Sequence, residues 1–353
     1  MRNTRGTGQY YEFTDENLMP ADFNDDFLNN DRNKTSLNDF LSRKIMEYDF
    51  GSTDVFVTIG NNVLSNRERE KGAQITELRY GCKHEEADIK IIIHVMNCLR
   101  NGYERLLVRT GDTDVVTLLL AHWHLFESTS QIQVDFGFGK SRRQYDINRI
   151  SEKISSEKLL GLIFFYTFSG CDVTSSFYYI SKIGWWNLWE THDFVTKTFI
   201  KLSWTPECVD EEDFQILETF VCKAYNPQNR FKTNNINKLR QLLFMSSSEN
   251  KLRMIPPSID SLRQHVLRSA FAGGWLWGSA FTRDVTMPSP THWGWRMNTE
   301  RDFVPIWCST AEISLPSITF TCKCKSICKR CKCAVNGEQC LPYCKCSCNF
   351  EGQ

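Results

Sequence analysis

The first half of the chain alternates between short apolar runs and segments whose apolar positions recur every three or four residues. The runs at 54–59, 106–108 and 132–138 are apolar or rich in β-branched residues, so they predict strands, with 106–108 buried. Helical spacing predicts helices over 36–46, 89–99, 115–120 and 159–168. Strands that alternate with helices are typical of an α/β fold, and we expect that class here.

Two stretches lack this alternation. Residues 1–35 are rich in Asn and Asp and carry little periodic apolar signal, so we expect a poorly ordered leader. From about residue 178 to 300 the chain is rich in aromatic residues, which at helical spacing form a core more often than a base-stacking surface. We therefore expect the α/β domain to cover 36–225 and an appended helical and irregular region to cover 226–315.

Two acids follow the predicted strand at 106–108. Asp112 and Asp114 come directly after it, and ligands of open α/β sheets bind at the carboxyl ends of strands, which favours a cation site. The alternative is that Asp112 caps the following helix and that Asp114 is only solvated.

Further acids lie beside two of the predicted helices. Glu86 and Asp88 fall in the first turn of the helix that contains 89–99, where acids complement the helix dipole. With Glu85 they place three carboxylates within four residues, and a shared cation would stabilise such a group. Asp172 follows Gly170, a position that turn chemistry also explains. Together these acids predict hard oxygen ligands for one or two Mg²⁺ ions near a phosphodiester.

The order of these acids resembles the later acidic motifs of the PIN-like flap endonuclease superfamily, over about residues 54 to 190. The resemblance implies a three-layer domain with a mainly parallel sheet, truncated at its N-terminus because the family's upstream acids have no assigned counterpart. It also implies a magnesium- or manganese-dependent endonuclease or exonuclease that hydrolyses phosphodiesters. The catalytic residues that it implies are Glu86, Asp88, Asp112, Asp114 and Asp172.

A glycine-containing basic segment follows the strand predicted at 132–138. Gly137-Phe138-Gly139-Lys140 leads into Ser141-Arg142-Arg143, without the spacing of a phosphate-binding P-loop. We expect a hairpin turn here, and the alternative is a basic contact to a phosphate backbone.

Composition narrows the function classes. Lys+Arg and Asp+Glu balance at 42 each, so no global charge indicates a nucleic-acid partner. No apolar run approaches the roughly 20 residues of a membrane-spanning helix, and the N-terminus lacks the apolar region of a secretory signal. We therefore expect no membrane partner, and we interpret the 15 cysteines as thiols or metal ligands rather than disulfides.

Nine of these cysteines fall within 27 residues of the segment 316–353, too densely to serve as packing residues. Zinc is the metal that such thiolates favour, and nine thiolates can bind about three tetrahedral ions if some of them bridge. Without metal, so short a segment has no core that could fold. The predicted ligands are Cys322, Cys324, Cys328, Cys331, Cys333, Cys340, Cys344, Cys346 and Cys348.

This cysteine spacing resembles the CXC domain of tesmin/TSO1-like proteins. The resemblance implies a zinc module that binds DNA, with Arg330 at the position that enters the minor groove and Lys329 and Lys332 beside it. DNA is then the expected partner, and the nucleus, or the nucleus and cytoplasm, is the expected location. The wider sequence resembles uncharacterised, transposon-derived animal proteins. The alternative function is therefore a catalytically decayed DNA- or protein-binding protein whose only working part is the zinc module.

Overall fold

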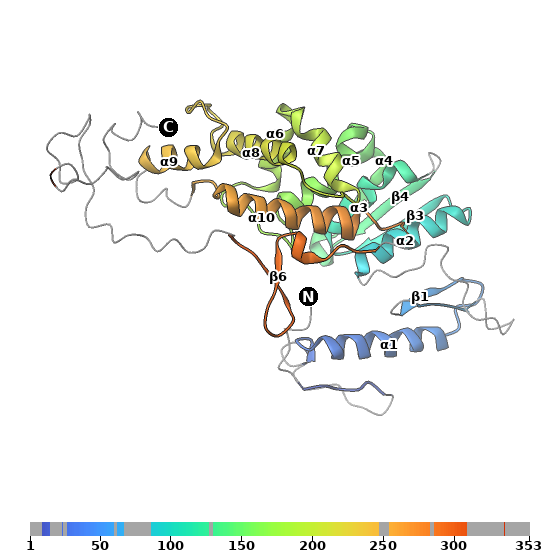
Figure 1. Ribbon diagram of the computed structural model, residues 1–353. Coiled ribbons are helices and arrows are strands. Elements are labelled where there is room, and N and C mark those ends of the chain that lie inside the picture. Colours follow the sequence, from blue (N-terminus) through green and yellow to red (C-terminus); the bar gives the residue numbers. More distant parts are fainter. Residues whose placement is uncertain are drawn as a thin grey trace. The chain divides into compact units, whose positions relative to one another are not determined.

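The computed structural model describes residues 9–14, 23, 27–59, 62–66, 86–126, 130–246, 254–282, 286–308 and 335. The chain divides into two compact units. Figure 1 labels their helices and many of their strands. The first unit comprises 1–163, 275–288 and 297–304, and the second comprises 164–274, 289–296 and 305–353. The division falls inside helix α5 (Ser156–Phe168).

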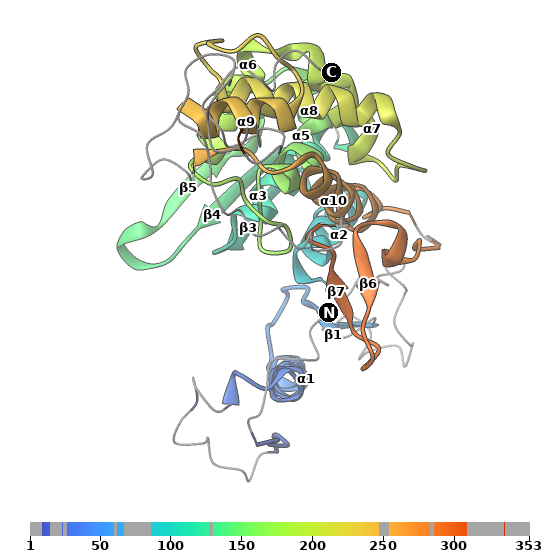
Figure 2. The same ribbon diagram turned by 60° about the vertical axis from the view of Figure 1, so that its left-hand side comes forward.

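The first unit combines helices with two small sheets (Figure 2). Its helices, besides the start of α5, are α1 (Asp31–Glu47), α2 (Ala87–Arg100), α3 (Thr113–Ala121) and α4 (Ile147–Ser151). Its strands are β1 (Phe56–Ile59), β2 (Asn62–Ser65), β3 (Arg105–Thr110), β4 (Gln131–Phe136) and β5 (Arg143–Asp146). The predicted mixture of helices and strands is thereby confirmed.

The N-terminal elements differ in detail from the predicted ones. Helix α1 begins at Asp31 instead of residue 36, because the side chain of Asn30 accepts a hydrogen bond from Arg32 N at 3.0 Å and caps the helix. Tyr11 N donates to the side chain of the buried Asn33 at 2.8 Å, so part of the predicted leader is tied to α1. Strand β1 pairs antiparallel with β2, a strand that the sequence pattern did not predict.

The larger sheet has the strand order β3–β4–β5. Strands β3 and β4 run parallel, in a register from Arg105 opposite Gln131 to Thr110 opposite Phe136. Strands β4 and β5 form the antiparallel hairpin that the glycine-containing segment predicted. The sheet is therefore mixed, and only the β3–β4 pair has the expected parallel character.

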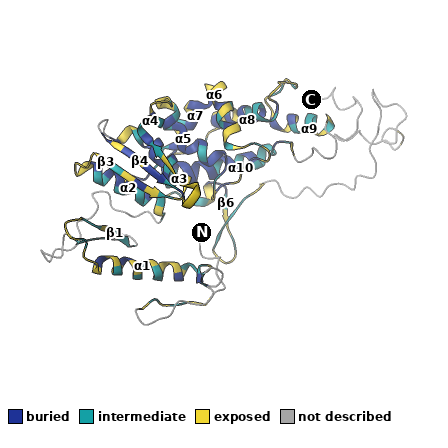
Figure 3. Ribbon diagram, turned by 180° about the vertical axis from the view of Figure 1, so that it is seen from behind, coloured by how far each residue is buried: buried dark blue, intermediate teal, exposed yellow. Residues whose placement is uncertain are grey.

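One face of this sheet is largely buried, and the other is largely exposed apart from the buried Asp135. Figure 3 colours each residue of the sheet by its burial. Val108, Ile132 and Val134 are buried, and α2 contacts β3 while α4 contacts β4. On the opposite face Leu107 is 64% exposed between the exposed side chains of Arg105 and Arg109. The strand at 106–108 was thus predicted wrongly as wholly buried. Three consecutive apolar residues must alternate between the two faces, so one of them meets solvent when only one face is covered.

The second unit is mostly helical. Besides the end of α5, its helices are α6 (Lys182–Thr191), α7 (Thr196–Ser203), α8 (Glu211–Tyr225), α9 (Ile236–Ser246) and α10 (Ile259–Ala270). A π-helical segment (Phe271–Trp277) continues α10, and β6 (Trp295–Met297) pairs with β7 (Phe303–Pro305). The division between the units falls within each of these three elements. Among the described helices, none has both the length and the apolar character that a bilayer crossing requires.

An aromatic core holds the second unit together. Trp185, Trp189 and Phe199 are fully buried. The Phe168 ring centroid lies 5.6 Å from that of Trp185, and the rings of Trp189 and Phe199 are 4.9 Å apart in an edge-to-face arrangement. Such pairs add about 0.5–1.5 kcal/mol each beyond the area that they bury. The prediction that aromatic residues of this region form a core is confirmed for Trp185 and Trp189.

Candidate metal centre

Asp112 and Asp114 lie where β3 gives way to α3. The Oδ1 atom of Asp112 accepts a hydrogen bond from Asp114 N at 2.9 Å and so caps the helix. Asp112 N donates to Thr110 Oγ1 at 3.0 Å, which fixes the turn after the strand. The capping role that the sequence offered for Asp112 is therefore confirmed, while Asp114 occupies the first turn, where the helix dipole favours a negative charge.

Helix α2 contributes its own acids at its first residues. Asp88 lies in the first turn and is half-buried, like Asp114. Glu86 is the N-cap residue, but its side chain makes no capping hydrogen bond. Its Oε2 atom instead accepts a hydrogen bond from Trp277 Nε1 at 3.2 Å.

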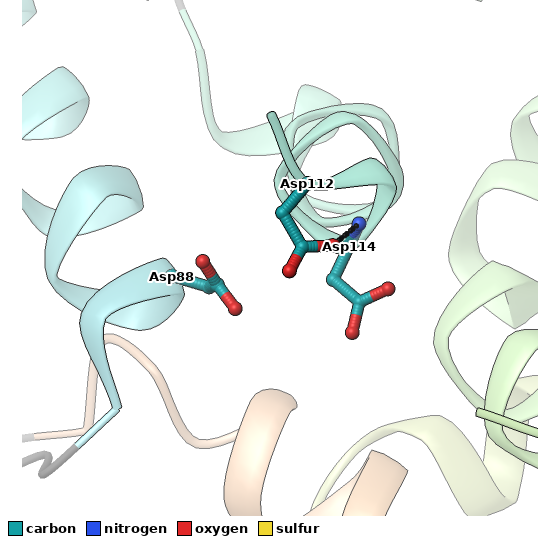
Figure 4. A group of neighbouring side chains, drawn as sticks. All are labelled: Asp88, Asp112 and Asp114. Carbon is teal, nitrogen blue, oxygen red and sulfur yellow. Dashed lines mark hydrogen bonds between the residues drawn. The ribbon is translucent and has the colours of Figure 1, made fainter. Parts of the chain in front are cut away.

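Three of these acids converge (Figure 4). One carboxylate oxygen each of Asp88, Asp112 and Asp114 lies within 4.8 Å of the other two. Figure 4 shows the side chain of Asp88 pointing from α2 toward the two aspartates at the start of α3. The starts of α2 and α3 therefore present their acids to one common space.

The donor set fits a hard divalent cation. Carboxylate oxygens are the ligands that Mg²⁺ and Mn²⁺ prefer, and oxygens bound to one Mg²⁺ are about 3–4 Å apart. The carboxylate oxygens of the three aspartates lie at most 4.8 Å apart, which is close to that spacing. Because Asp112 is exposed, water molecules can complete the coordination of the ion. The helix dipoles account for each acid singly. They do not account for the convergence of acids from two helices, an arrangement that could hold a shared cation.

The other predicted acids are not part of this group. Glu86 is directed to Trp277, as described above. Asp172 belongs to the second unit and lies exposed on a turn, between Cys171 and Thr174, which form an isolated β-bridge. Thr174 Oγ1 accepts a hydrogen bond from Cys171 N at 3.1 Å. Local turn geometry is therefore sufficient to explain where Asp172 lies.

The predicted zinc ligands and the three basic residues beside them lie outside the described residues. They are Cys322, Cys324, Cys328, Cys331, Cys333, Cys340, Cys344, Cys346 and Cys348, with Lys329, Arg330 and Lys332. The zinc module stays a prediction.

Two neighbours of the acidic group were not anticipated from the sequence. Trp277 donates a hydrogen bond to Glu86, and no local sequence pattern predicts a contact between residues that lie 191 positions apart. Phe138 packs on Gly111: a Cβ atom on that glycine would lie 2.8 Å from Phe138 Cε2. A glycine directly before Asp112 was the available signal, because a missing Cβ often marks a close approach.

The chain was also compared with known proteins. No protein-family model, no curated protein and no solved structure matches it.

Proposed function

We propose that the protein is a metal-dependent phosphodiester hydrolase of the PIN-like nuclease type. The observation that carries this proposal is the convergence of Asp88, Asp112 and Asp114 at the carboxyl end of β3. Ligands of open α/β sheets bind at that end of the strands, and the parallel β3–β4 pair has this geometry. The order of the acids, which resembles that of the PIN-like superfamily, supports the same reaction class and a three-layer domain.

In this proposal the three aspartates hold Mg²⁺ or Mn²⁺. The bound ion would supply Lewis acidity toward a phosphoryl oxygen and a lower pKa for water. The cap that Asp112 provides to α3 holds its carboxylate in one orientation, which reduces the cost of organising the site. By resemblance Glu86 would contribute as a further acid, with the indole of Trp277 orienting it.

The decisive experiment compares the wild-type protein with Asp112→Asn on single-stranded and flapped DNA, in Mg²⁺ and in Mn²⁺. Asparagine retains the capping hydrogen bond and removes the charge, so the fold is preserved. We expect metal-dependent cleavage, and a loss of about 100-fold or more in the variant, since several kcal/mol of stabilisation disappear. The matched control is Glu104→Gln, which neutralises an exposed acid directly before β3. Absence of cleavage by the folded wild-type protein in both metals would refute the proposal.

A second candidate function rests on the cysteine-rich segment. Nine cysteines in 27 residues favour a zinc module, and the CXC resemblance favours DNA as its partner. In this second candidate function, the zinc module is the only functional part of the protein, and the acids of α2 and α3 are the remnant of a catalytic site.

Native mass spectrometry tests this candidate, with three bound zinc ions expected and zero or one contradicting it. Substituting Lys329→Ala and Arg330→Ala together should weaken salt-dependent DNA binding. Unchanged DNA affinity in that variant would indicate a protein partner instead.

A further inference from the structure

The loop that joins β4 to β5 is held in one defined conformation. Gly137 and Gly139 have φ angles of +78° and +54°, which residues with a Cβ atom rarely adopt. The carbonyl oxygen of Phe138 accepts hydrogen bonds from Ser141 N at 3.1 Å and from Ser141 Oγ at 2.7 Å. Gly137 N donates to Thr110 O at 2.9 Å, so the loop is attached to the end of β3.

This conformation presents an aromatic ring to solvent. Phe138 is 67% exposed, although burial of a phenylalanine side chain would stabilise the fold by about 1.5–3 kcal/mol. One edge of the ring lies on Gly111, where a Cβ atom would approach Phe138 Cε2 to 2.8 Å. Gly111 directly precedes Asp112, so the ring contacts the residue next to the acidic group in the chain, and its remaining surface is accessible.

Cationic side chains surround the same loop. Lys140, Arg142 and Arg143 belong to it or border it, and all three are exposed. Arg142 donates two hydrogen bonds to the buried carboxylate of Asp135, at 2.6 and 2.7 Å, and this contact holds the pKa of Asp135 below its usual range. Within the described part of the chain, Lys140 and Arg143 form no ion pair. They therefore remain available to an anionic partner.

We propose that residues 137–143 bind single-stranded nucleic acid for the carboxylate site, with Phe138 stacked on an unpaired base and Lys140 and Arg143 on the flanking phosphates. The proposal rests on the proposed function and names its substrate class. Neighbouring bases cover both faces of each base in a duplex, so an exposed ring can stack only on an unpaired one. The position of Phe138 beside Asp112 would then place the backbone of that nucleotide near the three aspartates.

Binding is measured by fluorescence anisotropy with labelled single-stranded DNA and RNA in EDTA, so that cleavage is not needed. The full chain carries Lys329→Ala and Arg330→Ala throughout, which removes two cationic side chains from the C-terminal segment. Since base–aromatic stacking contributes about 1–3 kcal/mol, Phe138→Leu should weaken binding by about 5- to 150-fold. Leucine keeps the apolar contact with Gly111 but has no flat ring. Phe138→Trp should retain affinity.

The salt dependence of the affinity measures the contribution of the cationic side chains. Replacing Lys140 and Arg143 by alanine should reduce the dependence of log affinity on log salt by roughly 1.4, at about 0.7 per phosphate contact. Two exposed residues of the same unit serve as matched controls, Tyr48→Ala, which is also 67% exposed, and Lys153→Ala. Both controls should bind as the parent does.

The possible results separate this inference from the nuclease proposal. Wild-type affinity in Phe138→Leu, or equal affinity for duplex and single strands, would overturn the loop assignment even if Asp112→Asn abolishes cleavage. Preference of the loop for an acidic peptide over nucleic acid would overturn it as well. Stacking-dependent binding by a protein that cleaves nothing would support the loop assignment while refuting the nuclease.

Discussion

Asp112 has a structural role in the cap of α3 and a proposed role as a cation ligand. One carboxylate oxygen caps α3, and the carboxylate also lies beside those of Asp88 and Asp114. Aspartate and asparagine cap helices about equally well, whereas only aspartate adds a negative charge to the group. Substituting Asp112 by asparagine therefore tests the contribution of its charge to the cation site while the cap is kept.

We expect Asp112→Ala to lower the free energy of unfolding by about 1 kcal/mol, because the cap is lost, and Asp112→Asn to change it by less than about 0.5 kcal/mol. Urea denaturation in EDTA measures both variants. Added Mg²⁺ or Mn²⁺ should then stabilise the wild-type protein more than either variant, since an ion that binds only the folded state shifts the equilibrium. Equal stabilisation of Asp112→Asn and the wild-type protein would contradict a ligand role for Asp112.

Helix α8 shows how one element is anchored in the second unit. Its N-terminus carries a capping box in which Asp210 Oδ1 accepts from Asp213 N at 2.9 Å and Asp213 Oδ2 accepts from Asp210 N at 3.1 Å. Lys201 of α7 donates to both carboxylates, at 2.6 and 2.7 Å. Although burial opposes it, these hydrogen bonds raise the pKa of Lys201. The cap thus joins two helices and orients the α8 face that buries Phe220.

Asp210→Ala should lower the free energy of unfolding of the second unit by about 1–2 kcal/mol, because it removes the cap of α8. Asp210→Asn should recover most of that loss, since the amide oxygen still accepts from Asp213 N. Urea denaturation measures both variants, and the tryptophan fluorescence includes the signal of the buried Trp185 and Trp189 of this unit. Equal destabilisation by the two variants would assign the effect to the ion pair with Lys201 instead of the cap.

At the scale of the whole molecule, each unit contains a fully buried histidine. Burial lowers the pKa of His122 in the first unit and of His265 in the second to about 4. His265 Nε2 donates to Phe168 O at 2.8 Å, and in the neutral ring its Nδ1 accepts from Ser175 Oγ at 2.9 Å. Both units therefore fold around uncharged imidazoles.

Stability should consequently fall in mild acid. Above the unfolded-state pKa of about 6.5 neither state binds the proton, and the full stability is present. As the pH falls from 6.5 toward 4, the histidines of the unfolded chain bind protons that the buried histidines of the native state do not bind. The free energy of unfolding therefore falls by about 2 kcal/mol per histidine by pH 5. Urea midpoints at pH 7, 6 and 5 measure the loss. His265→Gln, which keeps a donor and an acceptor without titrating, should show a shallower dependence, and an unchanged slope would contradict this assignment.

Local patterns in the sequence were sufficient for the elements next to the candidate site and for the identity of the acids. The spacing of apolar residues placed β3, α3 and β4, because an element that packs on a core must repeat with its own period. The cap at Asp112 also followed from local chemistry. The earlier start of α1 and strand β2 did not follow, because a side-chain cap at Asn30 and a pairing partner override weak local signals.

The candidate site depended on tertiary structure. Sequence order alone treated Glu86, Asp88, Asp112, Asp114 and Asp172 as equivalent. Packing of α2 beside α3 selected Asp88, Asp112 and Asp114, and the indole of Trp277 holds Glu86. The contact between Phe138 and Gly111 likewise depends on the parallel pairing of β3 with β4, which brings the ends of the two strands together. Periodicity records which residues face a core, whereas the distance between two side chains on different elements is set only when those elements pack.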